Sequence, residues 1–261
     1  MIVVLFLLGT HEVSWLGRTD VPLFISHRRL ARQRRWPRAI GPWAEDSGGF
    51  SELSLFGAWV TTARDYAASV TRHAVEIGGM LWAAIQDWMC EPFMLDRTGL
   101  SLAEHQARTV SSYLELRELA PAVPWAPVIQ GWRRADYHDH VRQYAAAGVD
   151  LGAAPVVGVG SICRRQATDE AAEILGSLAA LGLRLHAFGL KTLGLRKIGG
   201  DVASADSMAW SLNARKNPPL PECSHRSCAN CLRYALRWRD QVLAEADRPR
   251  FRQLHLFGEE A

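Results

Sequence analysis

Cysteine, long apolar runs and tracts of biased composition are all scarce in this sequence. Its first apolar stretch, residues 1–8, is far shorter than the roughly 20 residues of a membrane-spanning helix and has no charged leader before it. We therefore interpret this stretch as a buried first strand and expect no membrane segment. The sequence also contains no repeat of solenoid period and no long low-complexity tract.

Only five of the 261 residues are cysteine, and no export signal precedes them. Cysteines without an export signal argue against a disulfide framework and predict a protein of the reducing cytoplasm. Three of them, Cys223, Cys228 and Cys231, lie close together near the C-terminal end. In an intracellular protein this spacing favours a metal site over three unpaired thiols. Cys90 and Cys163 have no evident partner in the sequence, and we treat them as small buried hydrophobes.

The residues that are abundant suffice for one sizeable core, because 48% are hydrophobic and 22% are charged. The formal net charge is only +3. Six arginines nevertheless gather in one short stretch: Arg28, Arg29, Arg32, Arg34, Arg35 and Arg38. Such a cluster could neutralise the phosphates of a nucleic acid, although a solvated basic face is more common.

Eight apolar runs resemble buried strands, and helix-like segments separate most of the later ones. The runs cover residues 1–8, 21–26, 39–44, 80–86, 125–129, 149–157, 184–188 and 202–205, and the helix-like segments cover 61–78, 102–119, 136–147 and 169–181. This order favours a parallel sheet covered by helices. We predict a (β/α)₈ barrel. A doubly wound α/β sheet is the alternative, because no obvious helices connect the first three runs.

Carboxylates follow three of these runs, at the strand ends where barrel enzymes carry their catalytic residues. They are Asp46, Asp87 and Asp206, and their recurrence favours one shared pocket. Near the other end of the chain, Pro-Pro-Leu-Pro at residues 218–221 indicates a linker. We therefore expect a barrel over residues 1–217 and a small zinc-binding module over residues 218–261.

The stretch 45–50 brings together a carboxylate, a hydroxyl and two glycines at the end of an apolar run. The glycines permit a tight turn and the close approach of a ligand to the backbone. Taken alone, this stretch is more often an Asx turn that ends a strand. Asp206 in Ser-Ala-Asp-Ser, taken alone, is likewise more often a helix N-cap.

Several short motifs occur in a fixed order along the chain. They are D-S-G-G-F at 46–50, V-I-Q-G at 128–131, G-V-G-S at 158–161, H-A-F-G-L-K at 186–191 and S-A-D-S at 204–207, followed by the cysteine group. This ordered set resembles the tRNA-guanine transglycosylases. Q-D-W-M-C-E-P at 86–92, V-G-V-G-S-I-C-R-R-Q at 157–166 and S-A-D-S-M-A-W-S at 204–211 resemble more specifically the branch that inserts 7-deazaguanines into DNA.

The resemblance implies a barrel with a zinc subdomain and a base-exchange reaction, in which a 7-deazapurine replaces guanine on the same sugar carbon. Exchange with retention calls for a nucleophile that holds the sugar while the bases change places, and a carboxylate can do this. By the resemblance, Asp206 attacks C1′ and forms a covalent intermediate. Asp46 protonates the departing guanine and then accepts a proton from the incoming base. ATP and redox cofactors are not required.

The resemblance also implies which residues bind the base. Asp87 would bind the amino and ring N–H edge of the purine, while Gln130 and the Gly131 N–H would bind its carbonyl edge. The remaining candidates are Ser47, Gly48, Gly158 and Gly160. Buried polar groups of this kind discriminate strongly, because a wrong base leaves them unpaired. Taken alone, Asp87 could be a strand-end cap and Gln130 a satisfied core amide.

Two departures from the family pattern leave details open. The family motif G-G-[LF]-[AS]-V-G-E is replaced by residues 157–161, which lack its final acid, so the preferred 7-substituent is not determined. Three thiolates and one further ligand would complete a structural zinc site. The resemblance makes His255 the first choice for that ligand, and His225 is the local alternative. The family spacing Cys-x-Cys-x2-Cys is wider here, at Cys223-x4-Cys228.

A base inside a duplex cannot be exchanged without leaving the stack, so the target nucleotide must be flipped or single-stranded. The motifs favour DNA and a 7-deazaguanine base as partners, and a helper protein of a DNA-modification system stays open. Acting on tRNA is one alternative, and a non-catalytic, zinc-bearing nucleic-acid-binding subunit is another. The arginines of residues 28–38 would contact the backbone, and Trp88 and Trp132 are candidates for stacking on a base.

Overall fold

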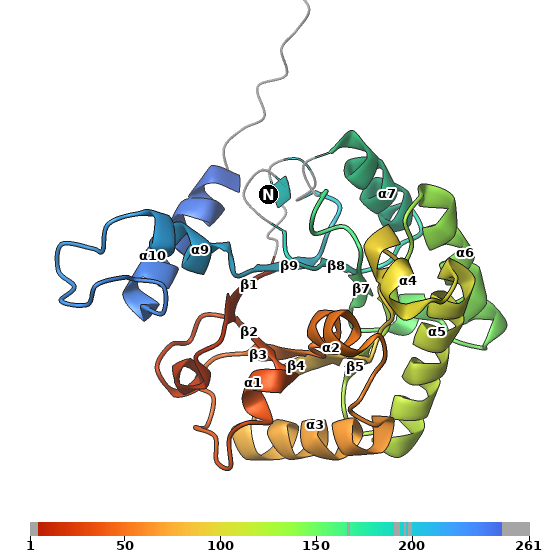
Figure 1. Cartoon of the computed structure of the whole chain (residues 1–261), viewed down its shortest axis with the longest axis horizontal. Coiled ribbons are helices and arrows are strands. Elements are labelled where there is room, and N and C mark those ends of the chain that lie inside the picture. Colours follow the sequence, from red (N-terminus) through yellow and green to blue (C-terminus); the bar gives the residue numbers. More distant parts are fainter. Residues whose placement is uncertain (1–4, 166–167, 191–193, 196, 198–199, 247–261) are drawn as a thin grey trace, which may run out of the picture.

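A ring of parallel strands forms the centre of the molecule (Figure 1). The computed structural model describes residues 5–165, 168–190, 194–195, 197 and 200–246. The strands in these ranges are β1 (Leu5–Thr10), β2 (Leu23–Ser26), β3 (Trp43–Asp46), β4 (Met80–Ala84), β5 (Trp125–Ala126), β6 (Val128–Ile129), β7 (Val157–Val159), β8 (Leu185–Ala187) and β9 (Ser204–Ser207). Their order in the sheet is β5-β4-β3-β2-β1-β9-β8-β7-β6, and every pair of neighbours is parallel.

The ring nearly closes at Pro127. This residue separates β5 and β6, which are the two outer strands in the sheet order and are consecutive in the chain. Proline has no N–H to donate to a ladder, so the single predicted run 125–129 divides into two short strands. The predicted (β/α)₈ barrel is therefore confirmed. All eight apolar runs contribute a strand, and the fifth contributes two.

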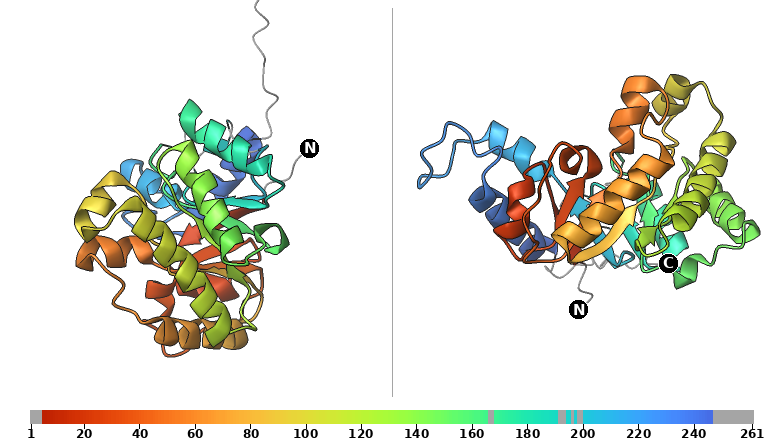
Figure 2. Two further views of the ribbon diagram at one scale, coloured as in Figure 1. Left: turned by 90° about the vertical axis from the view of Figure 1, so that its right-hand side faces the viewer. Right: turned by 90° about the horizontal axis from the view of Figure 1, so that it is seen from below.

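Helices surround the ring, as Figures 1 and 2 show. They are α1 (His27–Leu30), α2 (Gly49–Phe56), α3 (Ala63–Ile77), α4 (Pro92–Thr98), α5 (Leu102–Leu119), α6 (Arg134–Ala146), α7 (Asp169–Ala179), α9 (Ala209–Lys216) and α10 (Leu232–Ala246), with short 3₁₀ helices at Val13–Gly17 and Leu151–Ala153. The four predicted helical segments correspond to α3, α5, α6 and α7. Among the described residues, no helix combines the length and apolar character that crossing a membrane requires.

One predicted strand, residues 149–157, is wrong over most of its length. Strand β7 begins only at Val157, and the preceding residues form a 3₁₀ turn in which the Asp150 side chain accepts a hydrogen bond from the Gly152 N–H. Val149 and Leu151 are buried nonetheless, because the turn packs onto the core between strands and helices. The apolar run therefore predicted correctly that these residues are buried, but it predicted a strand where most of them form a turn.

Strand alternation decides which side chains reach the inside of the barrel. Successive residues of a strand point to opposite faces. On β3, Ala44 belongs to the core cluster inside the barrel, so Glu45 points outward and Asp46 inward. On β9, Ala205 belongs to the core cluster between strands and helices, so Asp206 points inward. The two carboxylates thus face the same interior at the C-terminal ends of their strands.

Glu45, on the outer face of β3, joins two helices to the strand that carries Asp46. Its Oε1 lies 2.8 Å from Nδ1 of His27 in α1 and 3.0 Å from Nδ1 of His73 in α3. Glu45 is 0% exposed, and both histidines are also buried. Burial pushes the pKa of Glu45 upward, but the two histidine hydrogen bonds outweigh it and leave the pKa below its usual value.

The C-terminal helices lie against the first strand. The Arg239 guanidinium of α10 donates to the Phe6 carbonyl at 3.3 Å, and the rings of Phe6 and Trp238 are 6.1 Å apart. Next to them, Trp210 of α9 contacts Trp15 at 5.3 Å between ring centroids. The described part of the predicted C-terminal module, up to residue 246, therefore packs against the barrel. The domain boundary at residues 217 and 218 stays a prediction.

Glu45→Gln tests the cluster that joins β3 to α1 and α3. A depressed pKa in the folded state stabilises the protein above the pKa of the unfolded state and ceases to do so as pH falls through the folded value. We expect a loss of about 3 kcal/mol in the free energy of unfolding at neutral pH, which shrinks below about pH 4.5. Urea denaturation across this pH range measures it.

Glu76→Gln is the matched control, because Glu76 forms an exposed ion pair with Arg72 at 3.0 Å. Exposed pairs contribute at most about 1 kcal/mol. Equal losses for the two variants at neutral pH would contradict a special role for the buried cluster.

Candidate active site and metal centre

A cavity of about 300 Å³ opens at the C-terminal ends of the strands. Six of the predicted site residues line it: Asp46, Ser47, Asp87, Gln130, Gly160 and Asp206. They come from five different strand ends, which confirms that the carboxylates of the sequence share one pocket. A cavity of this size, with polar groups at its base and apolar walls, is of the kind that binds small molecules.

Asp206 is fixed by partners on the neighbouring strand. Its Oδ1 accepts a hydrogen bond from the Gly189 N–H at 2.9 Å and lies 3.3 Å from Nε2 of His186. The other ring nitrogen of His186 lies 2.8 Å from the Ser204 hydroxyl, which the register of β8 and β9 places directly opposite. Asp206 is 7% exposed, and it borders the cavity. A carboxylate held in this way is aimed at whatever occupies the cavity.

Asp46 faces the same cavity, but in a setting that favours its protonated form. Burial raises its pKa to about 6, and the charges of Asp206 and Glu45 raise it as well. Hydrogen bonds from the Ser26 hydroxyl and the Gly48 N–H oppose this rise. A carboxyl group that titrates near neutral pH can both give and take a proton.

Asp87 and Gln130 form a polar pair at the base of the cavity. The Gln130 amide donates to Asp87 Oδ2, and the Ser47 hydroxyl donates to Asp87 Oδ1 at 3.3 Å. Gln130 is 0% exposed and Asp87 is 9% exposed. Burial raises the pKa of Asp87 to about 7, and the charge of Asp46 adds to the rise. The Asp87 carboxyl group of this pair therefore accepts hydrogen bonds when it is ionised and can also donate one when it is protonated.

Ser161 holds Gln130 from the other side. Its hydroxyl lies 2.7 Å from Gln130 Oε1 and 2.8 Å from Glu91 Oε2, and it accepts a hydrogen bond from the Cys90 N–H at 2.9 Å. Ser161 has a φ of 57°, in the left-handed region that few non-glycine residues adopt. The bonds to Glu91 and Gln130 hold it there. Behind them, His140 Nδ1 accepts a hydrogen bond from the Gln130 N–H at 2.8 Å.

The predicted glycines serve the site in different ways. A Cβ at Gly160 would lie 2.2 Å from the Gln130 amide nitrogen, so only glycine lets Gln130 occupy its place. Gly48 has a φ of 78° and begins α2 in the left-handed conformation. Gly48, Gly131 and Gly158 are not among the residues that line the cavity. Gly158 instead leaves room for the ring of Phe188, and Gly131 for the first turn of α6.

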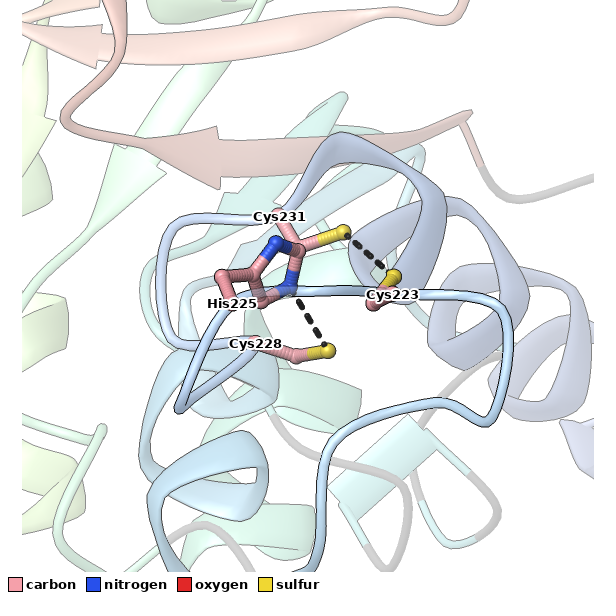
Figure 3. Close-up of side chains that lie close together, drawn as sticks. All are labelled: Cys223, His225, Cys228 and Cys231. Atoms are coloured by element: carbon pink, nitrogen blue, oxygen red, sulfur yellow. Dashed lines mark hydrogen bonds between the residues drawn. The ribbon is translucent and has the colours of Figure 1, made fainter.

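Four further side chains converge at the start of α10 and could hold a metal ion (Figure 3). They are Cys223, His225, Cys228 and Cys231, and their ligand atoms lie within 4.8 Å of one another. The sulfurs of Cys223 and Cys231 are 3.9 Å apart, and His225 Nε2 lies 3.1 Å from the Cys228 sulfur. Tetrahedral zinc with Zn–S bonds of about 2.3 Å places two sulfurs about 3.8 Å apart, which this arrangement matches.

His225 therefore lies among the cysteines, where the sequence had offered it as the alternative to His255. His255 itself falls outside the described residues. His27, Glu45 and His73 form a second group with metal-ligand atoms close together. Their separations of 2.8 to 3.1 Å are ordinary hydrogen-bond distances.

The comparison with protein families bears on this site. The family model of DpdA, deoxypurine in DNA protein A, matches residues 3–258. The chain belongs to the DpdA family. DpdA proteins are DNA 7-deazaguanine transglycosylases, which confirms the resemblance seen in the motifs and connects the chain with deazapurine modification of DNA. No curated protein matches the chain.

Within this DpdA site, three residues had no assigned role in the sequence. His186 supports Asp206, Glu91 contacts Ser161, and Ser161 contacts Gln130. His186 lies inside a motif of the ordered set, and Glu91 and Ser161 lie inside motifs that resemble the DNA-modifying branch, so the motifs contained the signal. Their partners are 20, 70 and 31 residues away in sequence. Only the closed barrel shows what they contact.

Asp87→Asn tests the electrostatic cost of the site. Because folding raises the pKa of Asp87 to about 7, stability falls as pH rises from about 4 to 7, and the full penalty of the buried charge applies above that range. Asparagine keeps the shape without the charge. We expect the variant to gain about 4 kcal/mol in unfolding free energy at pH 8 and little near pH 4. Denaturation at both pH values measures the gain, with the exposed Asp96→Asn as control. An unchanged stability at pH 8 would contradict the charge penalty.

Proposed function

We propose that this chain replaces guanine in DNA with a 7-deazaguanine base through a covalent aspartyl–sugar intermediate. One observation carries the proposal: Asp206 and Asp46 border the same base-sized cavity as the polar pair of Asp87 and Gln130. The cavity thus brings a fixed carboxylate, a proton-exchanging carboxyl group and a base-binding pair together. Membership of the DpdA family supports DNA as the polymer.

In the first half of the reaction, an Asp206 carboxylate oxygen attacks C1′ of the target nucleotide and the bond from C1′ to the guanine nitrogen breaks. The protonated form of Asp46, whose fraction is increased by the raised pKa of about 6, gives its proton to the departing guanine. The Gly189 N–H and His186 keep the attacking carboxylate in place. Guanine leaves as the neutral base, and the sugar is held as an ester of Asp206.

In the second half, the incoming 7-deazaguanine occupies the space that guanine has left. Asp46, now ionised, accepts the proton from its ring nitrogen, and that nitrogen attacks C1′ while the bond to Asp206 breaks. The two displacements restore the Asp206 carboxylate and the protonated Asp46, and they retain the configuration at C1′. Asp87, Gln130 and Ser47 bind the edge of either base, since the two purines share their amino, ring N–H and carbonyl groups.

The same chemistry on tRNA is the second candidate, because nothing in the cavity itself distinguishes deoxyribose from ribose. A non-catalytic, zinc-bearing partner subunit is the third. The family match favours DNA over tRNA as the substrate. The paired carboxylates favour a catalytic role over that of a non-catalytic subunit. The proposal leaves open whether a helper protein takes part, so the assay can be run with and without one.

Substitution of the two carboxylates separates their roles. Asp206→Asn should abolish both guanine exchange and the covalent intermediate, because no nucleophile remains. Asp46→Asn should retain DNA binding but lower guanine release by about 10²- to 10⁴-fold, the usual contribution of a general acid. Exchange of labelled guanine into DNA and tRNA, measured in parallel, and mass spectrometry of trapped protein–DNA adducts provide the readouts.

The exposed Asp20→Asn is the control for these variants. A trapped adduct on Asp46 would reverse the two roles, and full exchange by Asp206→Asn would favour the non-catalytic subunit. If guanine exchange occurred only with tRNA, the substrate would be tRNA and not DNA.

The raised pKa of Asp46 also predicts a pH dependence. Guanine release needs the protonated form, so the single-turnover rate of release should fall as pH rises above about 6. Rapid-quench measurements between about pH 5 and 8 follow this limb of the profile. A release rate that rises throughout this range would exclude Asp46 as the acid.

We further propose that the cysteine cluster holds a structural Zn²⁺ with His225 as the fourth ligand. The support is the donor set of three thiolates and one imidazole, whose ligand atoms lie within 4.8 Å of one another, with the sulfurs of Cys223 and Cys231 at the separation of two sulfurs on tetrahedral zinc. Such a site has no open position, so its function is to fix the loop that leads into α10. His225→Ala should then lose about one equivalent of zinc per chain, whereas His255→Ala should keep it. Elemental analysis of the purified proteins decides, and the reverse pattern would restore His255 as the ligand.

A further inference from the structure

Two aromatic side chains are exposed together at the mouth of the cavity. Phe50, which lines the cavity, is 45% exposed, and Phe93 is 39% exposed. Their ring centroids are 6.2 Å apart in an edge-to-face arrangement. Phe93 lies two residues beyond Glu91, the last cavity-lining residue before α4, so both rings belong to the rim. Large aromatic rings side by side at a polar cavity are typical of a binding surface.

Arg164 completes this group. It follows Cys163, another cavity-lining residue, and it is exposed. Its guanidinium carbon lies 4.5 Å from the centroid of the Phe93 ring and 5.3 Å from that of Phe50. We call Phe50, Phe93 and Arg164 the aromatic step. It offers flat apolar faces and a positive charge at one place, as sites for unstacked nucleotides do.

The tryptophans that the sequence offered for stacking are engaged elsewhere. Trp88 is only 8% exposed, belongs to a core cluster with Leu53, and is covered by the Arg108 guanidinium at 4.6 Å. Trp132 is half-buried, whereas Phe50 and Phe93 are exposed, and its ring packs against the Arg165 guanidinium at 4.2 Å. Phe50 and Phe93 are therefore more suitable for stacking than these two tryptophans, because both phenylalanine rings are exposed.

Further positive charge lies near His11. His11 also lines the cavity, and besides its burial the neighbouring charges of Arg29 and Arg215 lower its pKa. Arg29 belongs to the arginine stretch of the sequence, and Arg215 is in α9. Guanidinium groups thus act near His11 and next to Cys163, two residues of the cavity lining, whereas Asp87 and Asp206 are buried. This arrangement suits a phosphate backbone that crosses the mouth.

We propose that the aromatic step stacks on the base adjacent to the nucleotide that enters the cavity. A nucleotide that leaves its strand deprives the adjacent base of a stacking partner, and an aromatic face can replace that partner. Arg164 places its charge next to the phosphate between the two nucleotides. This inference rests on one part of the proposed function, namely that a nucleotide of a DNA strand enters this cavity. It does not depend on the exchange reaction itself.

Phe93→Ala and Arg164→Ala test the two parts of the aromatic step in the full chain. The matched control is Leu114→Ala, because Leu114 is 40% exposed on α5, away from the mouth. The probe is a fluorescein-labelled single strand of about 15 nucleotides. It contains one guanine, with 2-aminopurine as its neighbour on either side in separate probes. Anisotropy gives affinity across a salt series, and 2-aminopurine fluorescence reports stacking.

We expect Phe93→Ala to bind about tenfold more weakly with an unchanged salt dependence, and to lose the 2-aminopurine signal on one side of the guanine. Phe93→Tyr should retain both. Arg164→Ala should also reduce the slope of log affinity against log salt by about 0.7, which is one phosphate contact on a single strand. The Leu114 control should match the wild type, and thermal melting verifies that every variant is folded.

The proposal is overturned if Phe93→Ala matches the Leu114 control in affinity and fluorescence, or if the wild-type protein binds none of the DNA probes. These measurements need no catalytic turnover. Absent guanine exchange with an intact stacking signal would therefore count against the proposed reaction alone. Intact exchange in Phe93→Ala, with no change in binding, would count against the aromatic step alone.

Discussion

The burial of three carboxyl groups in one small cavity is the constraint that shapes this protein. Asp46, Asp87 and Asp206 face the same space, and burial raises the pKa of the first two, with neighbouring charge as a further cause. Carboxylates crowded in this way weaken a fold unless other contacts hold them in place. The supporting hydrogen bonds from His186 and Gln130 are therefore part of the fold as much as of the chemistry. Raised proton affinity is also what suits a carboxyl group to proton exchange at neutral pH.

The sequence predicted the barrel because each strand is a buried apolar run, and such runs are visible without knowledge of their partners. It predicted the six cavity-lining residues through ordered motifs rather than through spacing. The sequence did not predict the residues that hold these side chains in place, because tertiary structure determines which residues they contact. His73 meets Glu45 only because α3 packs beside β3, and His186 meets Asp206 only because of the register between β8 and β9. The 3₁₀ turn at Leu151–Ala153 was missed because burial alone does not reveal strand period.

The candidate metal ligands lie closer together in the sequence than the family pattern indicates. With His225 in place, the spacing becomes Cys223-x-His225-x2-Cys228-x2-Cys231. The imidazole thus occupies the position of the middle cysteine in the family spacing. All four ligand atoms then come from nine consecutive residues, so the loop can fold around an ion without help from a distant segment. The same loop precedes α10, whose side chains pack against β1.

Pro127 gives the barrel a seam. Around the rest of the described ring, neighbouring strands are held by ladders of hydrogen bonds, whereas β5 and β6 are joined through the chain itself. Gln130 follows β6 directly, beside this seam, while Asp46 and Asp206 belong to strands inside the continuous ladder. Gln130 therefore lies next to an interruption in the hydrogen-bond ladders of the described ring, whereas Asp46 and Asp206 lie at the ends of strands that are paired on both sides.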